Sequence, residues 1–122
     1  MRIFKNTWFT RFAKREKISD DALCKAVSEA EKGIVAADLG GQVIKQRVAR
    51  PGQGKSGGYR TIVIFQQGDK SFFVYGFAKS DRANIDKAEL EAFRQAAVHL
   101  LALDEEQLET LLKNGALTEV TP

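Results

Sequence analysis

The sequence predicts an α+β fold, with two helices near the N-terminus, an antiparallel β-meander of three or four strands, and C-terminal helices. Two patterns lead to this prediction. Apolar residues recur at helical spacing near both ends of the chain, whereas between residues 43 and 78 they alternate with polar residues or form β-branched and aromatic runs. A chain of 122 residues with 43% hydrophobic composition can bury one modest core, so we expect a single domain over residues 1–122.

The two N-terminal helices are predicted over residues 7–17 and about 20–32. The first is amphipathic and has a strongly basic polar side. The candidate N-caps of the second helix are Ser19, Asp20 and Asp21, and Gly33 is a stop signal. The only cysteine, Cys24, lies beside the apolar side of the second helix, and we expect it to be a small buried residue. The apolar side of the first helix contains Trp8, Phe9, Phe12 and Ala13.

The meander begins at residues 43–48, where side chains alternate with period two. Lys45 and Arg47 must therefore point to the same face of this strand. The following stretch, residues 51–58, is rich in glycine and contains a proline, and it predicts a positively charged loop. Two β-branched and aromatic runs separated by a short turn complete the meander, at residues 59–65 and 71–78.

Two helices are predicted after the meander. The first starts with Asp86 as its N-cap and Glu89 three residues later, which is the pattern of a capping box. The second runs from Asp104 to near Gly115. Residues 116–122 then form a short extended tail.

The charge of the chain is concentrated in one segment. Residues 39–68 contain no Asp or Glu and carry a formal charge of +5, whereas the rest of the chain has 14 basic and 16 acidic residues. Concentrated positive charge attracts polyanions, so nucleic acid is a better candidate ligand than a neutral metabolite. The basic residues of this segment are Lys45, Arg47, Arg50, Lys55 and Arg60.

Several classes of protein are not expected. No run approaches the roughly 18 apolar residues of a membrane helix, and residues 1–5 lack the pattern of a signal peptide. One cysteine and one histidine give no metal-binding spacing. We therefore expect a cytoplasmic protein with no metal site, no cofactor and no membrane partner.

Three ordered blocks, residues 40–48, 54–60 and 75–85, resemble the RelE/HigB/ParE superfamily of type II toxin-antitoxin toxins, most closely its HigB-like branch. The resemblance implies a compact fold like that of microbial ribonucleases. It also implies growth arrest through cleavage of messenger RNA in the A site of the 70S ribosome. The implied partners are messenger RNA, the ribosome and a cognate antitoxin. We expect the antitoxin to be a DNA-binding helix-turn-helix protein.

The candidate catalytic residues are cationic. Attack by the RNA 2′-hydroxyl requires a base, positive charge against the phosphate oxygens, and an acid for the departing 5′-oxygen. Arginine stays protonated, so Arg47, Arg60 and Arg82 are candidates to clamp phosphate. Lysine can lose its proton when other cations lie nearby, so Lys45 is the candidate base and Lys79 the candidate proton donor or phosphate contact.

Other residues are expected to hold RNA or the ribosome. The family implies a tyrosine shortly after the last basic block, but Asp86 stands there in this chain, so Tyr75 is a candidate for base stacking in its place. The only histidine, His99, is expected to be structural or exposed. The predicted RNA contacts are Arg50, Lys55, Tyr59 and Tyr75, and the predicted ribosome-docking residues are Arg11, Lys14 and Arg15.

Two other functions remain open at this point. A ParE-like inhibitor of DNA gyrase could use the same scaffold without cutting RNA, although it would not need convergent cations around a phosphate. A noncatalytic nucleic-acid-binding module would show strongly salt-dependent binding without cleavage.

Overall fold

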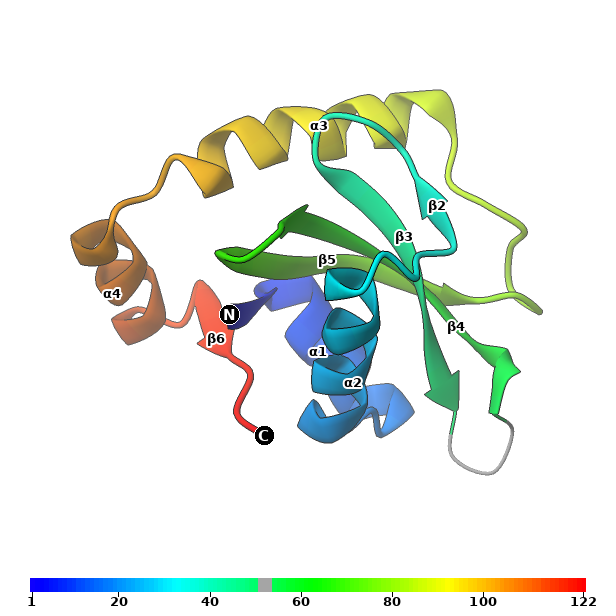
Figure 1. Cartoon of the computed structure of the whole chain (residues 1–122). Coiled ribbons are helices and arrows are strands. Elements are labelled where there is room, and N and C mark those ends of the chain that lie inside the picture. Colours follow the sequence, from blue (N-terminus) through cyan, green and yellow to red (C-terminus); the bar gives the residue numbers. More distant parts are fainter. Residues whose placement is uncertain (51–53) are drawn as a thin grey trace.

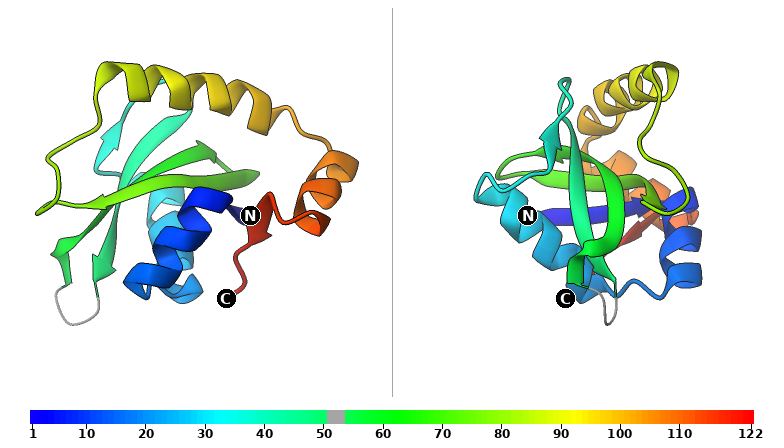
Figure 2. Two further views of the ribbon diagram at one scale, coloured as in Figure 1. Left: turned by 180° about the vertical axis from the view of Figure 1, so that it is seen from behind. Right: turned by 90° about the vertical axis from the view of Figure 1, so that its right-hand side faces the viewer.

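The computed structural model describes residues 1–50 and 54–122, and it confirms the α+β fold. One six-stranded sheet has the strand order β2-β3-β4-β5-β1-β6. Helices α1 and α2 lie on one face of this sheet, and α3 passes over the other (Figures 1 and 2). The elements are β1 (Arg2–Asn6), α1 (Thr7–Glu16), α2 (Asp20–Glu31), β2 (Ala37–Asp38), β3 (Val43–Arg50), β4 (Gly54–Gln66), β5 (Lys70–Ala78), α3 (Lys87–Leu101), α4 (Glu105–Lys113) and β6 (Leu117–Glu119).

The sheet is wider than the sequence predicts. The meander β3-β4-β5 is antiparallel as expected. In addition, β1 precedes the first helix and runs parallel to β5, with Phe4 beside Phe72, and β6 pairs antiparallel with β1. Strand β2 pairs with β3 through two residues. These added strands are only two to five residues long, and β1 and β6 pair with strands that lie far from them in the sequence. A period-two pattern cannot be recognised over so few residues, so the sequence did not predict them.

The predicted helix starts are confirmed by their caps. The Ser19 side chain accepts a hydrogen bond from the Ala22 amide at the start of α2. Asp86 and Glu89 form the expected reciprocal capping box at the start of α3. Each cap satisfies backbone amides that a helix leaves unpaired at its N-terminus.

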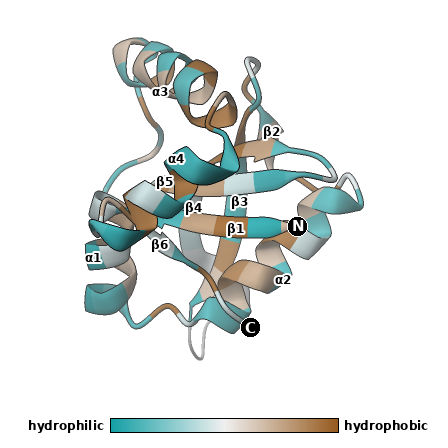
Figure 3. Cartoon of the chain, turned by 90° about the vertical axis from the view of Figure 1, so that its left-hand side faces the viewer, coloured by the Kyte–Doolittle hydropathy of each residue, from teal (hydrophilic) through white to brown (hydrophobic). Residues whose placement is uncertain are grey.

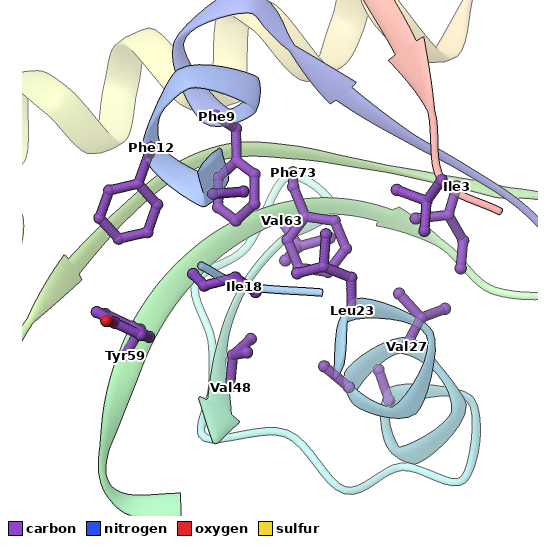
Figure 4. Packing of buried hydrophobic residues seen from close by; sticks show 14 of the residues in the cluster. Ile3, Phe9, Phe12, Ile18, Leu23, Val27, Val48, Tyr59, Val63 and Phe73 are labelled. Atoms are coloured by element: carbon purple, nitrogen blue, oxygen red, sulfur yellow. The ribbon is translucent and has the colours of Figure 1, made fainter. Parts of the chain in front are cut away.

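The core beneath α1 and α2 is aromatic and aliphatic (Figure 4). Phe9 and Phe73 are fully buried, and their ring centroids lie 5.1 Å apart. Cys24 was expected to be buried, and it is only partly buried, although it does pack against this cluster. In Figure 3 the strands at the centre of the sheet are largely hydrophobic, whereas α1 is largely hydrophilic.

The second core lies between the sheet and the C-terminal helices. Phe4 and Phe72 stack with centroids 5.1 Å apart, and Leu108 of α4 is fully buried in the same cluster. Arg2 joins β1 to α4 and β6 through Glu105, Glu109 and Glu119, at distances of 2.8, 3.4 and 2.9 Å. No helix in the described part of the chain has the length and apolar character needed to cross a membrane.

The β3-β4 pairing extends further than the sequence predicts. Strand β4 begins at Gly54, so part of the predicted loop is strand, while residues 51–53 lie outside the described residues. A register shift lies between Val48 and Arg50. A Cβ atom on Gly58 would lie 2.1 Å from the carbonyl oxygen of Val48. Glycine at this position is therefore required for the two backbones to approach.

Gly58→Ala is expected to destabilise the fold, because backbone must move to relieve the contact with Val48. The expected loss is about 2 kcal/mol or more in the free energy of unfolding, measured by urea denaturation. Val98→Ala, at an exposed position of α3, is the control and should stay within about 0.5 kcal/mol of the parent. Equal stability of the two variants would show that the strands do not approach as described.

Candidate functional site

The sheet face under α3 and α4 changes from apolar to cationic along its strands. Cross-strand partners form successive rows, because residues two apart on a strand point to the same face. Val43, Ile64 and Phe72 make up the buried row, Lys45, Ile62 and Tyr75 the next, and Arg47, Arg60 and Phe77 the last. The structure therefore brings Lys45, Arg47 and Arg60 together, and we call these three residues the cationic cluster.

Arg47 and Arg60 are direct cross-strand partners. Like charges opposite one another destabilise a sheet. Among the residues that the structure describes, no carboxylate lies within ion-pair distance of the cationic cluster. The Nη1 atom of Arg60 is buried without a hydrogen-bond partner in that part of the chain. An anion bound to the exposed part of this cluster would relieve the repulsion between the two guanidinium groups.

The position of the cationic cluster follows from the local pattern of β3. Its side chains alternate, so Gln46 points into the opposite core, where it is 4% exposed. The Gln46 side-chain amide donates to the carbonyl oxygens of Ala26 and Ile34 at 2.9 and 2.8 Å. These bonds fix the strand against α2, and they hold Lys45 and Arg47 on the other face.

Arg82, predicted to clamp phosphate, is engaged within the protein. Its guanidinium donates to both oxygens of Glu89 at 3.0 and 2.6 Å, to the Tyr75 hydroxyl at 3.0 Å, and to the carbonyl oxygen of Asn84 at 2.9 Å. These bonds lower the pKa of Glu89 below its usual value and raise that of Arg82. The guanidinium also lies over the rings of Tyr75 and Phe77, at 5.8 and 5.6 Å. Arg82 therefore joins β5 to the start of α3.

Tyr59 and Arg50, both predicted to contact RNA, lie together on the face opposite the cationic cluster. Tyr59 is 1% exposed, and its hydroxyl donates to Glu16 at 3.0 Å. Burial and this hydrogen bond raise its pKa. The Arg50 guanidinium lies 5.4 Å from the centre of the Tyr59 ring. The buried ring offers no face on which a base could stack.

The remaining predicted residues are distributed over the surface. Lys79 is exposed just beyond the end of β5, and Tyr75 is half-buried on the same face as the cationic cluster. The side chain of Lys55 lies outside the described residues. Arg11, Lys14 and Arg15 are exposed on α1, which covers the opposite face of the sheet; Arg15 pairs with Glu16 at 3.2 Å.

Two hollows in the described part of the surface lie away from the cationic cluster. Hollows of about 410 and 420 Å³ lie beside Gly41 and Gln42, at the opposite end of β3. A smaller hollow of about 280 Å³ includes Arg47 and Glu29, between β3 and α2. His99 is exposed in the last turn of α3, and no group of metal ligands is present among the described residues. The concentration of cations without carboxylate partners in the described part of the chain, rather than concavity, identifies the candidate site.

Sequence reasoning missed two residues that shape this site. Glu89 was expected only as a helix cap, although it also pairs with Arg82. Its spacing of seven residues from Arg82 crosses a loop, so no periodic pattern indicates the pair. Trp8 was expected on the apolar side of its helix but is 40% exposed. The available signal was its spacing of three and seven residues from Arg11 and Arg15, which places it at the border of the basic side.

Comparison with known proteins agrees with the resemblance in the sequence. A family model described as the RelE toxin of the RelE/RelB toxin-antitoxin system matches residues 1–120. No curated protein matches the chain. The match extends from β1 to β6, so it includes the terminal elements that lie outside the three sequence blocks. The family model does not distinguish the HigB-like branch, which stays a prediction. The chain therefore belongs to the RelE family of toxins from toxin-antitoxin systems.

Proposed function

We propose that this RelE-family toxin is a metal-independent endoribonuclease that cuts messenger RNA on the ribosome and so arrests translation. The observation that carries the proposal is the cationic cluster, in which Arg47 and Arg60 oppose one another without carboxylate partners among the described residues. Such a cluster is costly for folding and is suited to a phosphate group.

The chemistry proposed for this cluster is attack of the RNA 2′-oxygen on the adjacent phosphate. Arg60 and Arg47 hold the phosphate oxygens and stabilise the negative charge that develops on them. Lys45 lies two residues from Arg47 on the same face, and in its neutral amine form it accepts the proton of the 2′-hydroxyl. Lys79, exposed at the end of β5, donates a proton to the departing 5′-oxygen.

Arg82 is proposed to act as a positioning residue rather than as a free phosphate clamp. Its donors are occupied by Glu89, Tyr75 and the backbone of Asn84. It thereby fixes Tyr75 and Phe77, whose rings border Ile62 and Arg60 in the sheet. The two rings provide an apolar wall beside the cationic cluster.

The ribosome is proposed to supply the alignment that this site lacks. The two sheet rows that contain Lys45, Arg47 and Arg60 include no histidine and no carboxylate. Acid-base catalysis by this site alone is therefore expected to be weak. Holding the message with its 2′-oxygen in line for attack would compensate, because orientation can lower a large part of the activation barrier.

The family indicates a cognate antitoxin, and we propose that it is a DNA-binding protein that neutralises the toxin in the cytoplasm.

Arg60→Ala is expected to abolish growth arrest and to reduce cleavage of translated message at least 100-fold, because charge stabilisation is lost. Its thermal stability should stay close to that of the parent or rise, since repulsion by Arg47 is removed. Primer extension in a translating extract measures the cleavage. Lys113→Ala, on α4, is the control and should cut normally. Undiminished cutting by the Arg60 variant would refute the proposed site.

Arg82→Ala and Glu89→Gln are both expected to lower the melting temperature at neutral pH. The pKa of Glu89 is lowered in the folded protein, so its stabilising contribution is present when the carboxylate is ionised and is lost as the pH falls. The difference from the parent should therefore shrink below about pH 4. Thermal melts at pH 7 and pH 3 test this, and a difference that persists unchanged at pH 3 would contradict the role of the ion pair.

Translated message is expected to be cut much faster than the same naked message at equal toxin concentration, because only the ribosome aligns the reacting atoms. Cutting should not depend on the choice of zinc or manganese, provided that magnesium preserves the ribosome. Rapid cutting of naked RNA would contradict ribosome dependence. A selective demand for zinc or manganese would contradict the metal-independent chemistry.

A further inference from the structure

Trp8 is an exposed aromatic residue that no part of the proposed chemistry uses. It is the only tryptophan of the chain and lies in the first turn of α1. Its neighbours Phe9 and Phe12 are 0% and 4% exposed, whereas Trp8 is 40% exposed. The indole therefore leaves a large apolar surface in water at the edge of an otherwise closed core.

The Trp8 ring is held by aromatic neighbours from both faces of the sheet. Its centroid lies 5.1 Å from Phe12, with an interplanar angle of 19°, and 4.5 Å from Tyr75. Phe12 occupies the space that a side chain on Gly76 would need, since a Cβ there would lie 2.8 Å from the Phe12 ring. Because β1 pairs with β5 only from Lys70 to Phe73, Trp8 and Tyr75 meet beyond the end of that pairing. The indole is thus ordered before any ligand arrives.

The surroundings of Trp8 are cationic on two sides. Tyr75 belongs to the same sheet row as Lys45 and contacts Arg82. On α1, Arg11 and Arg15 follow Trp8 by three and seven residues and lie on the same side of the helix. The first turn of α1 contains no acidic residue, and Glu16 in its last turn is already bonded to Tyr59 and Arg15. A polyanion that follows this surface from the cationic cluster toward α1 would pass Trp8.

We infer that Trp8 is a stacking platform for an unpaired base of the RNA whose phosphate occupies the cationic cluster. The inference rests on the proposed function. Single-stranded RNA is recognised by cations that hold its phosphates and by aromatic rings that stack on its bases, and this surface offers both side by side. Trp8 binds RNA and takes no part in proton transfer. Arg11, three residues after Trp8 and exposed on the same side of α1, holds the phosphate of the nucleotide beyond the stacked base.

Trp8 fluorescence reports directly on this contact, because the chain has no other tryptophan. The probe is a single-stranded oligoribonucleotide with 2′-O-methyl sugars, which cannot undergo 2′-hydroxyl attack. Titration at low ionic strength should quench the tryptophan emission, with a midpoint equal to that of binding measured by anisotropy of a labelled oligonucleotide. Binding without any change in tryptophan emission would overturn the inference.

Three substitutions separate stacking from packing. Trp8→Ala should weaken binding of the oligonucleotide roughly 5- to 100-fold, the range expected for loss of one stacked base. Trp8→Phe should bind within about 3-fold of the parent, since it keeps an aromatic face. Trp8→Leu keeps an apolar contact with Phe12 and Tyr75 but cannot stack, and it should bind as weakly as Trp8→Ala. Equal binding by the leucine and phenylalanine variants would refute stacking.

The outcome for Trp8 can be distinguished from the outcome for the proposed function. If the parent cuts translated message and Arg60→Ala does not, while Trp8→Ala and Trp8→Leu bind and cut like the parent, only the Trp8 inference fails. If Arg60→Ala cuts like the parent, the proposed site fails. If the Trp8 variants bind RNA normally but no longer bind the antitoxin, Trp8 belongs to a protein interface and the inference is refuted.

Discussion

The register between β3 and β4 is the constraint on which the candidate site depends. Buried polar bonds fix it, since the Thr61 hydroxyl donates to the Gln46 carbonyl oxygen at 2.9 Å and the Gln46 side chain bonds to the backbone near α2. A shift of one residue would turn Arg47 and Lys45 into the aromatic core and would carry Gln46 to the other face. Burying unpaired charge costs far more than the repulsion between two arginines at the surface. A shifted register would bury charged side chains, so the fold keeps the cationic cluster on the face under α3 and α4.

The ion-pair partners of the arginine side chains decide which of them are available to bind a ligand. Arg2 is bonded to Glu119, whose pKa it lowers, and the pair joins β1 to the C-terminal strand. Arg82 is bonded to Glu89 and joins β5 to α3. These two arginines contribute to the architecture, whereas Arg47 and Arg60 have no such carboxylate in the described part of the chain. A basic residue in the sequence therefore indicates a ligand-binding role only when the structure shows that its charge is not already paired with a carboxylate.

The site combines this unpaired charge with a wall of fixed aromatic rings. Tyr75 lies between Trp8 and Phe93, with centroid distances of 4.5 and 5.8 Å, so it links α1 to α3 across the edge of β5. A register shift between Ile62 and Val63 allows both Val74 and Tyr75 to face the C-terminal helices, where they contact the same core cluster. Rigid rings and repelling cations are arranged before a ligand binds. Such preorganisation supports the proposal that charge stabilisation, rather than proton transfer, would be the main catalytic contribution.

The sequence alone determined the fold class, the helix caps, the meander and the common face of Lys45 and Arg47, because each depends on local periodicity or capping chemistry. It also indicated the RelE family through three blocks of residues. Only the tertiary structure decided the position of β1, the burial of Tyr59, the engagement of Arg82 by Glu89 and the exposure of Trp8. Each of these depends on contacts between segments that are separated in the chain or joined through a loop. Side-chain type and spacing showed which residues could bind phosphate, but long-range packing decided which of them are left without a partner.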